Sequence, residues 1–226
     1  MGVRCSTLSA RKIVAIIDQA TKDVPVPLSV TVVAEYGKDP FLILISCLLS
    51  LRAKDTKTIT VVRKLFSVAR TPQEFNALSQ KELEKIIYSI GFYQQKARTI
   101  KSVSAQLLAD FGGKVPRTKE ELLQLNGVGQ KTANLVLSTA YDIPAICVDV
   151  HVHRLSNLLG LVHTKTPEET EQALEKVFPK SYWSRINEVL VKLGQNIKKV
   201  APRLPADMQR CLISLVRKKQ KFEPKK

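Results

Sequence analysis

The chain has 226 residues, of which 44% are hydrophobic, so it can bury a core as one large domain or two small ones. Its formal net charge is +16, which favours a polyanionic partner such as nucleic acid over a merely soluble basic protein. The longest apolar run, residues 41–51, is too short to cross a bilayer, and no secretory signal is visible, so we expect an intracellular protein with no membrane partner.

Cysteine and histidine residues give no sign of a metal site. The four cysteines lie far apart in the chain: Cys5, Cys47, Cys147 and Cys211. No pair has the spacing of a metal or redox motif, so we expect reduced thiols rather than disulfides. The three histidines are His151, His153 and His163. No acid or thiol near them completes a metal-binding pattern, so we expect no metal.

The N-terminal region is predicted to contain two helices separated by a break. Residues 9–20 place apolar side chains at helical spacing, and a Val-Pro-Val-Pro stretch at 24–27 interrupts the pattern. Residues 28–33 are predicted to be extended or weakly helical. Asp39 and Pro40 then open a helix, as N-cap and first-turn proline. Because residues 41–51 are apolar on nearly every side, this helix is expected to be buried.

Three further helices are predicted before residue 112. The first covers residues 58–69. The second begins at a capping box formed by Ser79 and Glu82, and Gly91 is predicted to be its C-cap. The third covers residues 96–111. Its exposed side is predicted to be basic through Lys96, Arg98 and Lys101.

Residues 125–133, Leu-Asn-Gly-Val-Gly-Gln-Lys-Thr-Ala, are predicted to join two helices through a short hairpin. Glycine permits positive φ and close approach of another backbone. The second helix begins with unpaired amides and the positive end of its dipole, which suits an anion. We expect Gly127, Val128 and Gly129 to bind a nucleic-acid phosphate. The alternative is an ordinary helix–turn–helix corner whose glycines serve only the turn.

Lys131 and Asp149 are the candidate chemical groups. Lys131 stands in the first turn of the second hairpin helix, where the dipole disfavours its charge, and a lysine amine is a nucleophile only when neutral. Asp149 follows 18 residues later, directly after the apolar run 143–148. A single carboxylate in this position is a helix N-cap, a functional acid, or both.

The remaining chain is also predicted to be helical. Apolar spacing predicts helices over 150–159, 167–177 and 182–196, and the second begins at a clear cap formed by Thr166 and Pro167. No strand alternation and no internal repeat are visible. We therefore expect an all-α fold of around ten helices with short loops.

The stretch from Leu125 to Gly160 resembles the helix-hairpin-helix/Gly-Pro-Asp motif of the endonuclease III family of DNA glycosylases. The family has a glycine hairpin, a catalytic lysine in G-V-G-x-K-T-A and a catalytic aspartate in V-D-x-H. In this sequence the hairpin falls on Gly127 and Gly129, the lysine on Lys131 and the aspartate on Asp149. The similarity runs from about Phe41 to Asn196 in the expected order.

The resemblance implies two helical domains with a cleft between them. A six-helix domain with the hairpin would cover residues 33–143. The N-terminal helix, within 1–32, would join residues 144–216 in the second domain, followed by a basic tail at 217–226. Lys131 and Asp149 would then face each other across the cleft.

The resemblance also implies which residues contact DNA. Arg52 stands where the family has a polar side chain, usually glutamine, that enters the stack when the damaged base leaves; alternatively it is a surface arginine at a helix end. Phe92 stands in the family's wedge loop, although it would also suit a C-cap hydrophobe packed on the core. Further DNA contacts are assigned to Lys96, His151, His153 and Arg154, the last two as a support for Asp149 or a phosphate contact.

This sequence departs from the family at its C-terminal end. Most members hold a [4Fe–4S] cluster with four cysteines spaced C-x6-C-x2-C-x5-C. The matching region, 194–217, contains only Cys211, so we expect no cluster and infer that hydrophobic packing replaces it. The tail at 217–226 is expected to add salt-sensitive DNA affinity.

The resemblance implies a monomeric, DNA-associated glycosylase with AP lyase activity, acting on oxidised pyrimidines and abasic sites in double-stranded DNA. No cofactor is expected. Two alternatives stay open at this point: a mismatch or other damaged-base glycosylase on the same fold, and a non-catalytic DNA-binding protein. A structural helix-hairpin-helix module would not explain an acid 18 residues after the lysine.

Overall fold

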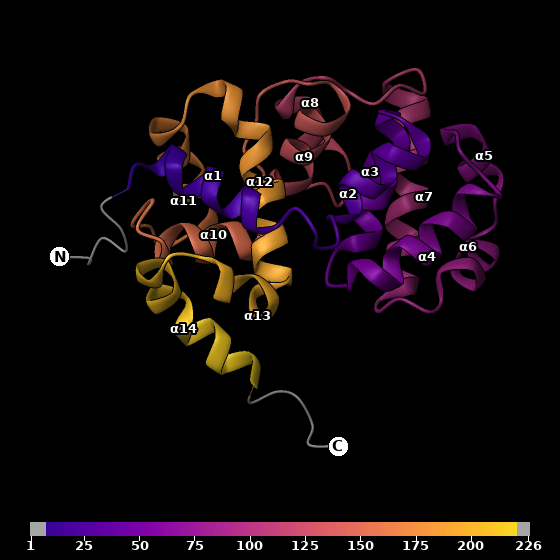
Figure 1. Cartoon of the computed structure of the whole chain (residues 1–226). Helices are drawn as coiled ribbons and strands as arrows, with labels where there is room; N and C mark the ends of the chain where they lie inside the picture. The colour runs from indigo at the N-terminus through magenta and orange to yellow at the C-terminus, as the bar shows by residue number, and fades with distance from the viewer. Residues whose placement is uncertain (1–7, 221–226) are drawn as a thin grey trace. The chain divides into compact units, whose positions relative to one another are not determined.

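The computed structural model describes residues 8–220, with side chains for residues 8–213. Within this range it contains fourteen α-helices, one 3₁₀ helix and no strand, so the all-α prediction is confirmed (Figure 1). The expected number of around ten helices was too low, because α5 and α13 have only six and four residues, too few to show a helical period. Cys5 and the side chains of the predicted tail lie outside the described part.

The chain divides into two compact units. One unit is continuous and consists of residues 27–145, and the other combines residues 1–26 with residues 146–226. The sequence had placed these divisions at 32/33 and 143/144. Each unit has its own hydrophobic core.

The unit of residues 27–145 contains helices α2 to α9 (Figure 1). Their bounds are α2 Leu28–Tyr36, α3 Pro40–Ser50, α4 Asp55–Phe66, α5 Pro72–Ala77, α6 Gln80–Ile87, α7 Tyr93–Asp110, α8 Lys119–Gln124 and α9 Gln130–Ala140. Residues 28–33, predicted to be extended or weakly helical, are part of the regular helix α2. Packing outweighs the low helix propensity of its valines here, because Leu28 and Val32 are buried in the unit's core.

Helix α3 lies at the centre of this unit. Every residue from Phe41 to Leu49 is buried, as the apolar pattern predicted. The Asp39 carboxylate accepts hydrogen bonds from the amides of Phe41 and Leu42, both at 2.9 Å, and Pro40 occupies the first turn. The predicted N-cap is therefore confirmed, and it fixes where the central helix begins.

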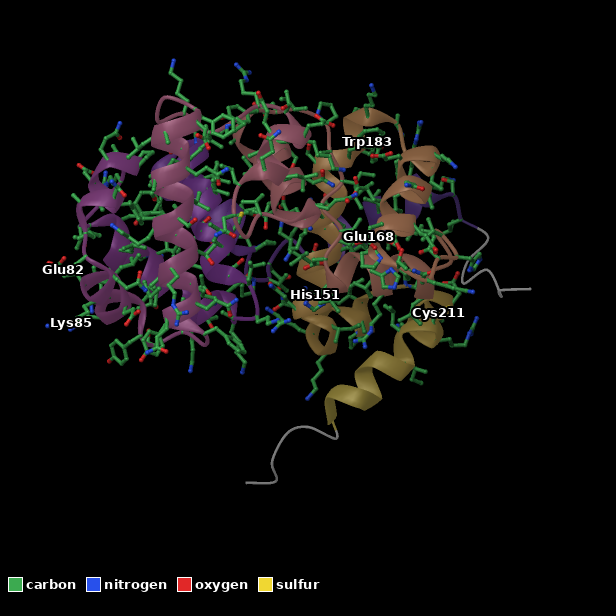
Figure 2. All side chains as sticks on the ribbon, turned by 180° about the vertical axis from the view of Figure 1, so that it is seen from behind. Glu82, Lys85, His151, Glu168, Trp183 and Cys211 are labelled. Atoms are coloured by element: carbon green, nitrogen blue, oxygen red, sulfur yellow. The ribbon has the colours of Figure 1, made fainter. Side chains whose placement is uncertain are left out.

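Helix α6 begins at the predicted capping box. The Ser79 hydroxyl accepts from the Glu82 amide at 3.2 Å, and the Glu82 carboxylate accepts from the Ser79 amide at 2.8 Å. Hydrogen bonds to the carboxylate from the Ser79 hydroxyl and from the Ser79 backbone amide lower the pKa of Glu82 below its ordinary value. Figure 2 shows Glu82 and Lys85 on the outward side of α6. Gly91 does not have the left-handed conformation expected of a C-cap glycine; the next residue, Phe92, has it instead.

The other unit contains α1, α10 to α14 and η1. Their bounds are α1 Ala10–Ala20, α10 Val150–Leu158, α11 Pro167–Val177, α12 Lys180–Gln195, α13 Ile197–Val200, η1 Ala201–Arg203 and α14 Ala206–Gln220. Helix α12 packs against both α1 and α10. The predicted cap of α11 is confirmed, because the Thr166 hydroxyl accepts from the Glu169 amide at 3.2 Å.

An ion-pair cluster ties the end of α1 to the segment before α14. The Arg203 guanidinium pairs with the Asp23 carboxylate and also donates to the Ala20 carbonyl at 3.2 Å. Lys199 lies 3.6 Å from the same carboxylate. The hydrogen bond from Arg203, helped by both positive charges, lowers the pKa of Asp23 to about 2.

The expectation of reduced thiols throughout was wrong for one cysteine. Cys47 and Cys147 are free and buried, as expected, but Cys211 is disulfide-bonded. Sequence separation did not predict this, because folding brings distant segments within the short distance that a disulfide needs.

Residues 8–220 contain neither a candidate membrane span nor a candidate metal site. None of the helices in this range is long and apolar enough to span a bilayer. No group of three or more His, Cys, Asp and Glu residues lies close enough to hold a metal ion in the same range.

Candidate active site

The glycine hairpin connects the end of α8 to the start of α9. Gly127 has φ +79°, and a Cβ atom added to it would lie 2.6 Å from the Thr99 methyl carbon on α7. Both its conformation and its surroundings therefore require glycine. Gly129 differs, because its φ is −100° and a Cβ atom there would meet nothing within 4 Å. The second glycine leaves open space at the helix start.

Helix α7 holds the hairpin in place. The Asn126 amide donates to the Gln106 side chain at 3.1 Å, and the Asn126 side chain donates to the Ser102 hydroxyl at 3.1 Å. Gln106 also donates to the Gln124 carbonyl, at the end of α8, at 3.0 Å. Thr99, Ser102 and Gln106 lie on one face of α7, so this helix forms a rigid support for the turn.

The hairpin presents amides to an incoming anion. Among the described residues, neither the Gly127 amide nor the Gly129 amide has a hydrogen-bond partner. The N-cap of α9, Gly129, contributes no side-chain cap either. Val128 does not share this property, because its amide donates to the Leu125 carbonyl at 3.0 Å and its side chain is buried. The phosphate contact predicted for the hairpin thus concerns the two glycines.

Lys131 is exposed at the second position of α9. Cys47, a buried residue of α3, lies close enough to Lys131 for the lysine's positive charge to interact electrostatically with the thiol. Burial raises the pKa of the Cys47 thiol to about 12, and the Lys131 charge opposes this shift only partly. Since the thiol stays protonated, Cys47 is not a competing nucleophile beside the lysine.

Asp149 is the N-cap of α10. Its Oδ1 atom accepts hydrogen bonds from the amides of His151 and Val152, both at 2.9 Å. The residue is half-buried and follows the buried segment 145–148. One carboxylate oxygen is therefore held by the helix start, and the whole group has a fixed position.

His151, which is labelled in Figure 2, packs directly on the backbone of α12 at Gly194. A Cβ atom added to Gly194 would lie 2.2 Å from the His151 Nδ1 atom, so only glycine permits this contact. Sequence reasoning missed Gly194. The available signal was a glycine inside a long amphipathic helix, where it weakens the helix unless packing requires it. Gly194 thus helps to place the first turn of α10, next to Asp149.

His153 belongs to a hydrogen-bonded network between α10 and α11. Its Nδ1 atom lies 2.6 Å from the Thr170 hydroxyl, which also contacts the Thr164 hydroxyl at 2.6 Å. Asn157 completes the network by donating to the His153 carbonyl at 2.9 Å. Arg154 is exposed. His153 therefore has a supporting position, whereas the Arg154 side chain is accessible.

A cavity of about 330 Å³ lies within the unit of residues 27–145. Its lining residues are Leu48, Leu51, Arg52, Phe92, Gln95, Lys96, Thr99 and Gly127. The cavity brings together Arg52, Phe92 and the first hairpin glycine, which are distant in the sequence. The Arg52 guanidinium lies 5.8 Å from the centre of the Phe92 ring, a cation–π distance.

Phe92 is 58% exposed, so it does not pack on the core as the alternative interpretation required. Both Phe92 and Arg52 have positive φ, at +59° and +54°. This conformation costs a non-glycine residue on the order of 1–3 kcal/mol, and such strain gathers at functional sites.

Lys96 does not lie on an exposed basic side, as the sequence had suggested. It is only 7% exposed, and its Nζ atom donates to the Leu49 carbonyl at 2.6 Å. Burial lowers the pKa of Lys96 to about 8. Lys101 does not extend into solvent either, because its Nζ atom donates to the carbonyls of Asn76 and Leu78, both at 2.6 Å.

Comparison with known proteins identifies the family and the fold. A family model described as HhH-GPD superfamily base excision DNA repair protein matches residues 45–180. Endonuclease III of Thermotoga maritima is 49% identical to this chain over 161 residues, which cover 71% of the chain and 76% of that protein. The chain belongs to the endonuclease III family. It is an endonuclease III-like DNA glycosylase and AP lyase of base excision repair.

Two solved structures of endonuclease III with DNA resemble this endonuclease III-like chain. A trapped covalent intermediate, an estranged-adenine complex, is 36% identical with a TM-score of 0.70, covering 84% of this chain and 87% of that one. A non-covalent endonuclease III–DNA complex is 37% identical with a TM-score of 0.72 and the same coverage.

The residues of the C-terminal segment do not fit the iron–sulfur cluster found in most of this family. Such a cluster needs four thiolates, and residues 194–217 supply one cysteine, Cys211, which is disulfide-bonded. The buried positions of the segment are instead apolar, among them Leu204, Met208 and Leu212. These side chains form part of the unit's hydrophobic core.

Proposed function

We propose that this chain excises oxidised pyrimidines from double-stranded DNA and cleaves the strand 3′ to the resulting abasic site, with Lys131 as nucleophile. The observation that supports this most strongly is the placement of an exposed lysine at an uncapped helix start, behind a glycine hairpin with two unpaired amides. The endonuclease III captured as a covalent intermediate with DNA supports a covalent mechanism.

DNA binding brings the damaged nucleotide out of the duplex, because the reacting atom is inaccessible within the base stack. The amides of Gly127 and Gly129 bind a phosphate of the damaged strand. Phe92 wedges between the bases, and Arg52 occupies the space that the base has left. The exposure of Phe92 and the contact of both side chains at one cavity support these roles.

Chemistry begins at the sugar. The neutral Lys131 amine attacks C1′ of the deoxyribose, and the bond from C1′ to the base breaks, so the base leaves with the electron pair and takes up a proton. Ring opening gives a Schiff base between Lys131 and C1′. The Schiff base acidifies the C2′ proton, and its removal expels the 3′ phosphate by β-elimination, which breaks the strand.

Asp149 assists at two points. Its carboxylate accepts the proton that Lys131 must lose before attack and stabilises positive charge that develops on the sugar. Both tasks need a carboxylate with a fixed position, and the two bonds from the start of α10 support this assignment. His151 supports Asp149 through the position of α10, while Arg154, being exposed, contacts a phosphate.

The proposal is tested by reductive trapping with sodium borohydride. One duplex carries a single thymine glycol, an oxidised pyrimidine, and a second carries a single abasic site. We expect covalent protein–DNA adducts with both duplexes, because borohydride reduces a lysine Schiff base to a stable amine. Lys131→Gln is expected to abolish both adducts, whereas Lys85→Gln, which changes an exposed lysine on the outward side of α6, is expected to keep them.

Each other outcome has a definite meaning. An adduct on the abasic duplex alone keeps the lyase reaction and contradicts oxidised pyrimidines as the substrate. Tight duplex binding with no adduct on either substrate contradicts the proposed chemistry and favours a DNA-binding protein without catalysis.

A further inference from the structure

Two strained residues border the same cavity. Within residues 8–220, only three residues other than glycine have positive φ: Arg52, Phe92 and Asp142. Arg52 lies in the turn after α3, and Phe92 is the residue from which α7 starts. Their backbones come from segments 40 residues apart in the sequence, yet their side chains meet at the rim of one cavity. A contact between the two turns is needed to fix the position of Arg52 relative to Phe92.

Lys96 is the residue that connects them. Its own amide donates to the Phe92 carbonyl at 2.9 Å, which is the first backbone bond of α7. Its side chain reaches across to α3 and donates to the Leu49 carbonyl at 2.6 Å. Lys96 is thus bonded at one end to the turn containing Phe92 and at the other to the helix end that leads into Arg52.

The Leu49 carbonyl is one of the acceptors that a helix leaves unpaired at its C-terminal end. Two neighbouring carbonyls are satisfied locally, because the Ser50 hydroxyl donates to Cys47 and the Ala53 amide donates to Ser50. Leu49 is satisfied from another helix. A lysine is well suited here, because a positive charge near a helix C-terminus interacts favourably with the helix dipole.

Keeping a lysine in this position opposes folding. Its side chain is 7% exposed, and no carboxylate pairs with it within the described range. A buried ammonium without a counterion is unfavourable relative to an apolar side chain of similar length. A methionine would fill the space without this penalty, so the lysine needs a reason other than stability.

We propose that Lys96 is a positioning residue for DNA entry: by linking the Leu49 carbonyl to the start of α7, it holds Arg52 and Phe92 so that both side chains enter the duplex together. This inference rests on the proposed function, since it assumes that the two residues act on stacked DNA. Lys96 has no part in the sugar chemistry, because the nucleophile of that reaction is Lys131.

The inference predicts different effects on two substrates that contain the same abasic site, one in a duplex and one in a single strand. An abasic site in a duplex must be opened by the wedge before the sugar reaches the nucleophile. The same abasic site in a single-stranded oligonucleotide needs no opening. A residue that acts through Arg52 and Phe92 therefore matters for the first substrate and not for the second, whereas a general loss of folded protein lowers both alike.

The test compares the Lys96→Met and Lys101→Met variants of the full chain with the unsubstituted chain. Lys101 is the matched control, because it lies on the same helix and also donates from Nζ to carbonyls at a helix end, that of α5. Cleavage rates are measured on both abasic substrates, and the thermal midpoint of each variant is recorded.

For Lys96→Met we expect kcat/KM on the duplex to fall by about ten- to hundredfold, as small misplacements of binding groups do, with little change on the single strand. For Lys101→Met we expect an unchanged ratio between the two substrates. An equal loss on both substrates with Lys96→Met, or the same change of ratio with Lys101→Met, would overturn the inference. If the unsubstituted chain cleaves neither substrate, it is the proposed function that fails.

Discussion

The two helices that contain the proposed chemical groups begin in opposite ways. Helix α9 starts at Gly129, which offers no side-chain cap, and Lys131 follows in its first turn. Helix α10 starts at Asp149, whose carboxylate accepts from two amides of its own helix. A helix end without a cap is a ready site for an external anion, whereas a capped end holds its own acid in place.

The difference assigns different tasks to the two helix starts. In the proposed function, the start of α9 binds the DNA and supplies the nucleophile, because its amides and its lysine are both accessible. The start of α10 would supply a negative charge at a fixed position, because Asp149 is half-buried and hydrogen-bonded. Substitutions at the two helix starts test whether DNA binding, catalysis and stability depend on different residues.

The largest effect is expected at Asp149, where cap and charge can be separated. Asparagine caps helices as well as aspartate does, so Asp149→Asn is expected to keep stability, whereas Asp149→Ala is expected to lose about 1 kcal/mol. Both variants lose the carboxylate, so both are expected to lose roughly 10²- to 10⁴-fold in strand cleavage. If Asp149→Asn cleaved the strand as fast as the unsubstituted chain, Asp149 would be a structural cap only.

The two hairpin glycines are expected to respond differently to alanine. Gly127→Ala forces a left-handed residue against Thr99 and is expected to cost about 1–3 kcal/mol of unfolding free energy. Gly129→Ala meets nothing within 4 Å and is expected to change stability by less than about 0.5 kcal/mol.

Gly129→Ala nevertheless places a methyl group where a phosphate approaches. Because a hydrogen bond to a charged group contributes about 1.5–3 kcal/mol, we expect duplex affinity to fall about tenfold or more. Titration of a fluorescent duplex at fixed salt measures this. Unchanged affinity in Gly129→Ala would mean that the amide at this position does not bind DNA.

A smaller effect is expected at Gly194. The added methyl of Gly194→Ala overlaps the His151 ring, and overpacking of this kind costs about 1–3 kcal/mol. Chemical denaturation measures the loss. The double variant with His151→Ala removes the ring that clashes, so it is expected to recover part of that loss. A strictly additive double variant would contradict a direct contact between the two residues.

An effect similar in size to that at Gly194 is expected at Lys96, as a pH dependence of stability. Its pKa is lowered to about 8 from the ordinary 10.5 because of burial, so between these pH values the unfolded chain binds a proton that the folded chain releases. Stability of the unsubstituted chain relative to Lys96→Met is therefore expected to rise by about 1–3 kcal/mol between pH 8 and 10.5. A stability difference between the unsubstituted chain and Lys96→Met that stays constant over this pH range would contradict the burial of the Lys96 ammonium.

Local rules allowed much of the fold to be predicted from the sequence. The apolar run 41–49, the caps at Asp39, Ser79 and Thr166, and the hairpin at 127–129 all depend on residues a few positions apart. Such features can be predicted because the hydrogen bonds that they require form between residues close in the sequence, whatever the rest of the fold is.

Features that depend on distant contacts could not be predicted. Lys96 was expected on a surface because helical spacing gives no information on which carbonyl lies opposite; only the fold brings Leu49 to it. The sequence left residues 28–33 as extended or weakly helical, because the stability of α2 comes from burial of Leu28 and Val32 rather than from propensity. The need for glycine at Gly194 appears only once His151 is packed against it.

The most direct test of the central claim is to locate the covalent bond itself. The unsubstituted chain is incubated with a duplex containing one abasic site, reduced with borohydride and digested with nuclease and protease, and the modified peptide is sequenced by mass spectrometry. We predict that the sugar remnant is attached to Lys131. Attachment to any other amine, with the Lys131 peptide unmodified, would contradict the assignment of the start of α9 as the reactive centre.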